Sequence, residues 1–350
     1  MPRGFQSIQE EVVHTFSQNS VGSRFLFLPD NYDGNKEPAD IAWVCADVAL
    51  LFYCNANGRS YEKAVKHNIR QAKTWLNKWS DELPLVGKNS SEQFNVHRSS
   101  ISGIVVLSVV DCPNAGAQIH LDATKKFERE GVVAIATVPE TIFKQMASLG
   151  ASLGDFLALL NFLPKDGSKI EESELRKLFA EANKDIFQIL MEVRETEAGR
   201  RWTDQFLYTL ASVRAGATEG GGRAGNDNIA FVLADIGFRE IAWLGAAGFK
   251  AVQAVESVPV GKAGVVALSQ KFGSRTHGVL AGPLHLLPSQ MDRPDLSDVR
   301  ESGLLFNLIE IKPRVWHSMF AFSHSFAESN ISIQIQRIIA RRSGNIFTLR

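Results

Sequence analysis

Residues 40–55 read DIAWVCADVALLFYCN, and this stretch decides the fold of the first half of the chain. Its two segments, 40–45 and 48–54, are rich in Val, Ile, Leu and aromatic residues, which are the residue types that strands favour. Two residues alone, Ala46 and Asp47, separate the segments. We therefore expect an antiparallel β-hairpin in this part of the chain.

The segments around this hairpin predict a sheet that is covered by helices. Residues 5–18 and 61–79 place apolar side chains three or four residues apart, which is typical of amphipathic helices, and Ser60 stands where a cap of the second helix is expected. Residues 24–28 and the runs SGIVVLSVVD and GVVAIATV have the composition and length of strands. Residues 1–163 are thus expected to form an α/β domain with a mixed sheet flanked by helices.

A second domain is expected to follow. The stretch LPKDGSK at 163–169 combines Pro, Gly and charge, which favours a boundary. Helical periodicity then extends over 168–193 and about 198–214. Later segments are strand-like: NIAFVLAD, FKAVQAVES, AGVVALSQ, LLFNLIEIK and ISIQIQRII. Residues 164–350 are therefore predicted to form an α+β domain, helical first and then mostly strands, with no role indicated by the sequence.

Composition limits the classes of partner. The chain has 350 residues, which is enough for two hydrophobic cores, and it holds 38 Lys plus Arg against 38 Asp plus Glu. A nucleic acid or an anionic membrane must therefore be met by a local patch of charge. No apolar run reaches the roughly 18 residues that span a bilayer, so we expect no membrane partner. The three cysteines lack CxxC spacing, which favours a reducing compartment, and we expect a cytoplasmic protein.

One local patch of positive charge stands out. Lys63, Lys66, Arg70 and Lys73 follow each other at spacings of three, four and three, so they gather on one side of the helix expected over 61–79. Such a row suits a phosphate backbone, because cations that neutralise phosphates release condensed counterions. An ordinary solvated helix face fits the same pattern, and the sequence leaves both interpretations open.

The order of helix, strands, helix and strand resembles the core of the PD-(D/E)XK (restriction-endonuclease-like) nucleases, in particular their NERD-like members. In that family an Asp at the start of one strand and a Glu-x-Lys on the next hold a divalent cation and polarise the attacking water. The resemblance matches these positions to Asp40, Tyr53 and Asn55, with Gln71 on the following helix and Glu11, or its neighbour Glu10, on the first.

The match departs from the family at the two positions that carry its chemistry. A phenol with a pKa near ~10 is a poor ligand for a hard cation, and the amide of Asn55 supplies no positive charge. The resemblance therefore implies a degenerate core with no metal site, or Asp40 as its one ligand. We expect a non-catalytic binding protein whose partner is nucleic acid or another protein.

The rival hypotheses are enzymes. Glu62 lies four residues before Lys66 and could replace the missing acid as a migrated ligand of a Mg²⁺-dependent nuclease. A hydrolase that uses the C-terminal domain is the second rival. No cofactor is expected unless the nuclease hypothesis holds, in which case it is Mg²⁺. The string GxGxxG at 220–225 lacks a preceding strand, so no dinucleotide partner is expected.

Overall fold

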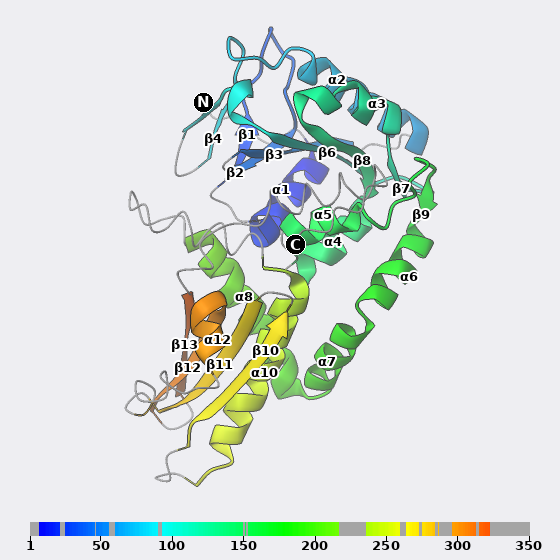
Figure 1. Cartoon of the computed structure of the whole chain (residues 1–350). Helices are drawn as coiled ribbons and strands as arrows, with labels where there is room; N and C mark the ends of the chain where they lie inside the picture. The colour runs from blue at the N-terminus through cyan, green and yellow to red at the C-terminus, as the bar shows by residue number, and fades with distance from the viewer. Residues whose placement is uncertain are drawn as a thin grey trace.

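The computed structural model describes residues 7–21, 25–45, 47–55, 60–89, 93–149, 151, 153–216, 236–259, 264–272, 275–283, 286, 296–312 and 315–322. Within them, a mixed nine-stranded sheet is flanked by helices and a separate four-stranded sheet lies in the C-terminal half (Figure 1). The expected α/β architecture with a mixed sheet is confirmed.

The larger sheet has the strand order β5-β4-β1-β2-β3-β6-β8-β7-β9. Strands β3, β6 and β8 are parallel to one another and the remaining pairs are antiparallel. The elements of this part are α1 (Ile8–Val21), β1 (Leu26–Pro29), β2 (Ile41–Cys45), β3 (Val48–Asn55), α2 (Tyr61–Leu76), β4 (Leu85–Lys88), β5 (Gln93–Val96), β6 (Gly103–Val110), β7 (Gly116–Ile119), α3 (Leu121–Lys126), β8 (Val132–Pro139), α4 (Glu140–Ser148), α5 (Leu153–Leu159) and β9 (Ile170–Glu171).

The hairpin expected over 40–54 is present. Strands β2 and β3 pair antiparallel in a register that sets Ile41 opposite Phe52. Helices α1, α4 and α5 cover one face of the sheet, and α2 and α3 cover the other (Figure 1). Strands β6 and β8 are buried along their whole length, because helices close both faces of the sheet at its centre.

Several local expectations for this part are corrected. Helix α2 ends at Leu76 and not at Trp79, whose ring stacks on Trp75 from the following turn with centroids 5.9 Å apart. Ser60 stands at the N-cap of α2 but makes no side-chain capping hydrogen bond. Strands β4, β5 and β7 were not expected, because four-residue strands carry too few residues to display a period.

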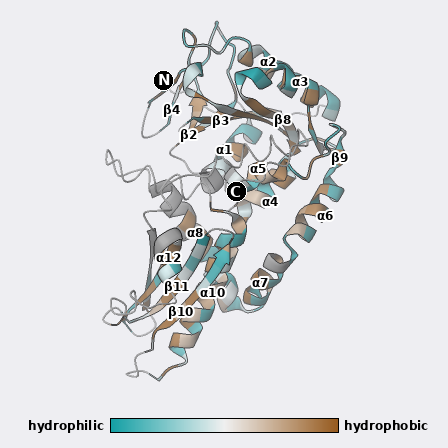
Figure 2. Ribbon diagram, in the orientation of Figure 1, coloured by the Kyte–Doolittle hydropathy of each residue, from teal (hydrophilic) through white to brown (hydrophobic). Residues whose placement is uncertain are grey.

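The smaller sheet has the order β10-β11-β12-β13, with β11 and β12 parallel and the outer pairs antiparallel. Helices α8 and α10 pack on one of its faces and α12 on the other. Figure 2 shows hydrophobic and hydrophilic residues mixed along α6 and α7, as amphipathic helices require. The elements are α6 (Glu172–Ala182), α7 (Lys184–Arg194), α8 (Glu197–Gly216), α10 (Phe238–Glu256), β10 (Val266–Phe272), β11 (Arg275–Pro283), α12 (Ser297–Ser302), β12 (Leu304–Lys312) and β13 (Val315–Phe322).

Two expectations for the C-terminal half are wrong. The segment 249–257, expected as a strand, is the end of helix α10, since Phe249, Val252 and Val255 recur every third residue and lie on its buried side. The long helix expected over 168–193 is two helices, α6 and α7, which meet at Asn183. The segments NIAFVLAD and ISIQIQRII and the glycine string at 220–225 lie outside the described residues.

Residues beyond the expected boundary at 163 pack with the larger sheet. Strand β9 pairs with β7, and Phe179 of α6 and Phe238 of α10 belong to the apolar cluster that α4 and α5 form beneath the sheet. The backbone N–H of Phe238 also donates to Asp155 Oδ2 on α5, at 2.8 Å. The division into domains at this point stays a prediction.

Candidate functional site

A groove of about 740 Å³ runs along the exposed flank of α2. Lys66, Arg70 and Lys73 line it from the helix, and Lys169, which precedes β9, adds a fourth cation. Its other lining residues are Tyr61, Glu62, Val65, Ile69, Thr74, Asn77, Gln118 and His120. The groove therefore lies between α2 and the part of the sheet that holds β7.

The helical period explains why these cations gather. The apolar stripe of α2 is buried against the sheet. Residues next to this stripe on the helix surface therefore point sideways, along the sheet and toward β7. Three members of the row predicted from the sequence, Lys66, Arg70 and Lys73, reach the groove. Lys63 is exposed but does not line it. Three of the four residues of the row thus line one groove.

The groove carries an excess of positive charge. Among the described residues, no carboxylate pairs with Lys66, Arg70 or Lys73. Glu62 is the one carboxylate in the lining, and Lys169 is already paired with Glu171 at 2.7 Å. An anion placed here would therefore meet three cations that form no ion pair with a carboxylate of the described residues.

His120 forms a neutral wall of the groove. Its Nδ1 lies 3.1 Å from the Gln118 amide nitrogen, which donates to it, and its Nε2 lies 2.8 Å from Thr137 Oγ1. Burial, and then the charge of Lys73, lower the pKa of His120 from 6.5 to about 4. The imidazole is therefore uncharged at neutral pH and offers hydrogen bonds rather than charge.

Of the three strand positions matched to the nuclease core, Asp40, Tyr53 and Asn55, only Asp40 is an acid. Asp40 is half-buried, and its Oδ2 accepts the backbone N–H of Cys54 at 2.5 Å. Tyr53 is fully buried and its hydroxyl donates to the carbonyl of Pro38. Burial, followed by the charge of Asp40, raises the pKa of Tyr53 well above 10. The side chain of Asn55 lies outside the described residues, while its backbone pairs with β6.

On α2, Asn68 forms hydrogen bonds with the matched strand and with β6. Asn68 is fully buried, and its Nδ2 donates to the carbonyl of Tyr53 at 3.0 Å and to Ser108 Oγ at 2.9 Å. Gln71 is half-exposed and does not line the groove. The sequence held a signal for Asn68, since it is a polar residue inside the apolar stripe between Val65 and Ile69.

Of the acids proposed beside the core, Glu11 and Glu62 are exposed and Glu10 is buried. On α1 the structure buries Glu10, which is 2% exposed, and leaves Glu11 in solvent. Glu62 is exposed on the rim of the groove, beside Lys66. No three His, Cys, Asp or Glu side chains of the described residues gather as metal ligands would.

Comparisons with known proteins add no relative: no protein-family model, no curated protein and no solved structure matches the chain. Within the described ranges, no helix has both the length and the apolar character that crossing a membrane requires. The function must therefore be inferred from the groove and its surroundings.

Proposed function

We propose that the protein binds nucleic acid through the groove along α2 and does not cleave it. The observation that carries this proposal is the set of three cations, Lys66, Arg70 and Lys73, that share one hollow without a carboxylate partner among the described residues. Phosphates of a nucleic-acid backbone supply the missing negative charge, and their neutralisation releases counterions. Because the chain as a whole has no net charge, this local excess of cations is the surface that would attract a nucleic acid.

The dimensions of the row favour contact with a backbone. From Lys66 to Lys73 the helix rises about 10 Å, at about 1.5 Å per residue. One strand of duplex DNA presents a phosphate about every 3.4 Å along the axis, so this length spans about three steps between successive phosphates. The row is therefore long enough for each of its three cations to contact a phosphate.

The groove favours a duplex over a single strand. Single strands are held by aromatic rings on which unpaired bases stack. Among the described residues that line this groove, Tyr61 is the one Phe, Tyr or Trp, and the ammonium of Lys169 lies 4.8 Å from the centre of its ring. This ring is therefore covered by a cation rather than left for a base to stack on.

The proposal includes a nuclease-like core that has lost its chemistry. The order α1, β1 to β3, α2 and β6, with β3 parallel to β6, agrees with the resemblance to PD-(D/E)XK nucleases. The buried hydroxyl of Tyr53 and the engagement of Asp40 with a backbone N–H support the absence of a catalytic metal. A protein partner remains the alternative, and a cytoplasmic location remains an expectation.

The test of binding is a double charge reversal, Lys66→Glu with Arg70→Glu. We expect affinity for a short labelled DNA duplex, measured by fluorescence anisotropy at about 50 mM salt, to fall on the order of 100-fold, because two phosphate contacts become repulsive. The matched control is Lys177→Glu with Lys184→Glu, which changes the same charge at exposed sites on α6 and α7. An equal loss of affinity in both double variants would show that only net charge matters and would refute binding at the groove.

The absence of cleavage is tested separately. We expect the protein to leave plasmid DNA, single-stranded DNA and RNA intact in the presence of Mg²⁺ or Mn²⁺. Cleavage that disappears both in Asp40→Ala and in Glu62→Ala would instead establish the migrated nuclease site, and binding at the groove would then serve catalysis.

A further inference from the structure

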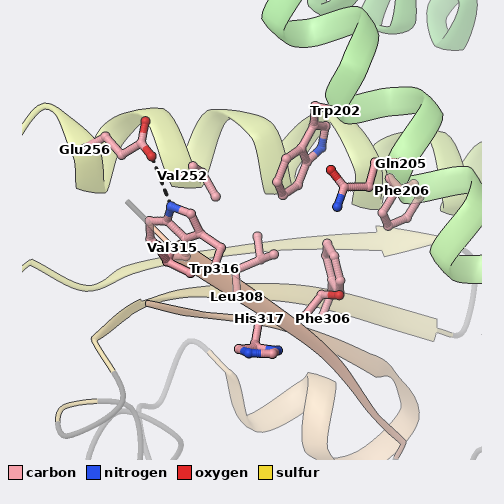
Figure 3. Close-up of a pocket in the computed structure, with 11 residues that line it drawn as sticks. Trp202, Gln205, Phe206, Val252, Glu256, Phe306, Leu308, Val315, Trp316 and His317 are labelled. Carbon is pink, nitrogen blue, oxygen red and sulfur yellow. Dashed lines mark hydrogen bonds between the residues drawn. The ribbon is translucent and has the colours of Figure 1, made fainter. Parts of the chain in front are cut away.

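A second hollow, of about 410 Å³, lies between α8, α10 and the strands β12 and β13 (Figure 3). Among the described residues, it shares no lining residue with the groove on α2. Its walls are mainly aromatic and aliphatic. They come from Trp202, Phe206, Val252, Phe306, Leu308 and Trp316. Figure 3 shows Leu308 and Phe306 pointing from the sheet toward the helices, so they form the floor.

The hollow has the size and the accessibility of a small-molecule site. Its volume falls within the roughly 300–1,000 Å³ that ligand pockets occupy. Val315 at its edge is 47% exposed, and Gln205 and Ser318 in the lining are exposed as well. A molecule can therefore enter from solvent and bury its apolar part against the floor.

One carboxylate, that of Glu256, lies in the lining of the hollow. The described part of the lining contains neither Lys nor Arg, and its other titratable residue is His317. Glu256 Oε1 accepts the indole N–H of Trp316 at 3.0 Å, which holds the carboxylate beside the ring. Among the described residues no other side chain bonds Glu256, so its second oxygen is left for a ligand.

The second indole is also held in place. Trp202 Nε1 donates to the carbonyl of Gly245 at 2.8 Å, which fixes the ring on the far side of the hollow. Indole faces attract cations through their quadrupole, and the attraction grows when water is excluded. Two positioned indoles and one carboxylate thus favour the same type of ligand.

We propose that this hollow binds a small organic cation, an ammonium group carried on an aromatic or aliphatic body. The ammonium pairs with Glu256 and lies near the indole of Trp316, while the body rests on Leu308 and Phe306. An anionic ligand of the same shape is repelled by Glu256, and a neutral one leaves the carboxylate without a counter-charge.

The experiment titrates the full chain with phenethylamine, phenethyl alcohol and 3-phenylpropionate, and follows the indole N–H signals of Trp202 and Trp316 by NMR. We expect the amine to bind at least 10-fold more tightly than the alcohol and the carboxylate not to bind. Glu256→Gln should remove this preference, because the amide still accepts from Trp316 but carries no charge. The control Glu195→Gln, at the exposed C-cap of α7 and outside the lining of the hollow, should keep it.

A second variant tests the proposal even if Glu256→Gln disturbs the fold. Val315→Lys places a cation at the exposed edge of the hollow and should weaken amine binding several-fold with an unchanged melting temperature. Equal affinities of the amine and the alcohol, or no shift of either indole signal with any of the three probes, would overturn the proposal.

Discussion

Asn68 links helix α2, which lines the groove, to strands β3 and β6 of the sheet. Its side chain donates to both the Tyr53 carbonyl and Ser108 Oγ in a fully buried position. We expect Asn68→Ala to lower the free energy of unfolding by about 1–3 kcal/mol, because buried acceptors lose their donor. Urea denaturation measures this. Gln71→Ala, one turn away and half-exposed, should change stability by less than about 0.5 kcal/mol, and an equal cost at both sites would contradict the assignment.

Two largely buried histidines are expected to make the folded state sensitive to acid. Burial lowers the pKa of His14 from 6.5 to about 4, and burial with the charge of Lys73 does the same for His120. In the unfolded chain these two imidazoles bind protons below pH 6.5, whereas in the folded chain they bind protons only near pH 4. Their contribution to stability is therefore full above pH 6.5 and is lost as the pH falls toward 4.

The variant His120→Gln tests this dependence. Between about pH 7 and about pH 5 it should lose on the order of 1 kcal/mol less stability than the wild type, as measured by urea denaturation at each pH. His97→Gln, at an exposed site, serves as the control. An unchanged pH dependence in His120→Gln would mean that the imidazole titrates freely in the folded state.

At the scale of the elements, helices α8 and α10 approach each other closely because α10 carries glycines. A side chain at Gly245 would begin 2.9 Å from the ring of Phe206, and one at Gly248 would begin 3.0 Å from Phe306 and 3.1 Å from Trp202. We expect Gly245→Leu to cost about 1–3 kcal/mol by overpacking. Thermal unfolding measures this cost. Ala254→Leu, at an exposed position of the same helix, should be nearly neutral, and a neutral Gly245→Leu would show that the helices can separate freely.

The elements also show what sequence patterns can and cannot predict. The hairpin of β2 and β3 and the buried strands β6 and β8 were predictable, because each carries a continuous run of strand-forming residues. Helix α10 was missed over 249–257, since the apolar residues of this segment fit a strand as well as a helix. The break at Asn183 was missed because the apolar period continues on either side of it.

Only the residues of the candidate site that lie on one helix, α2, were predictable from the sequence. Spacing alone placed Lys66, Arg70 and Lys73 on a common face of α2. Lys169 and His120 come from distant parts of the chain, and the fold alone brings them to the same groove. The hollow lined by Trp202 and Trp316 was not expected for the same reason, since these residues lie on different elements more than one hundred positions apart.

At the scale of the whole molecule, a protein without net charge is proposed to hold a polyanion through one local excess of cations. The salt dependence of binding tests this most directly. The logarithm of the affinity for a DNA duplex should fall with the logarithm of salt concentration with a slope of about −3, from about three phosphate contacts at about −0.9 each. Lys73→Ala should reduce the steepness by about one unit and Lys177→Ala should not. A slope near zero, or one that Lys73→Ala leaves unchanged, would contradict the account.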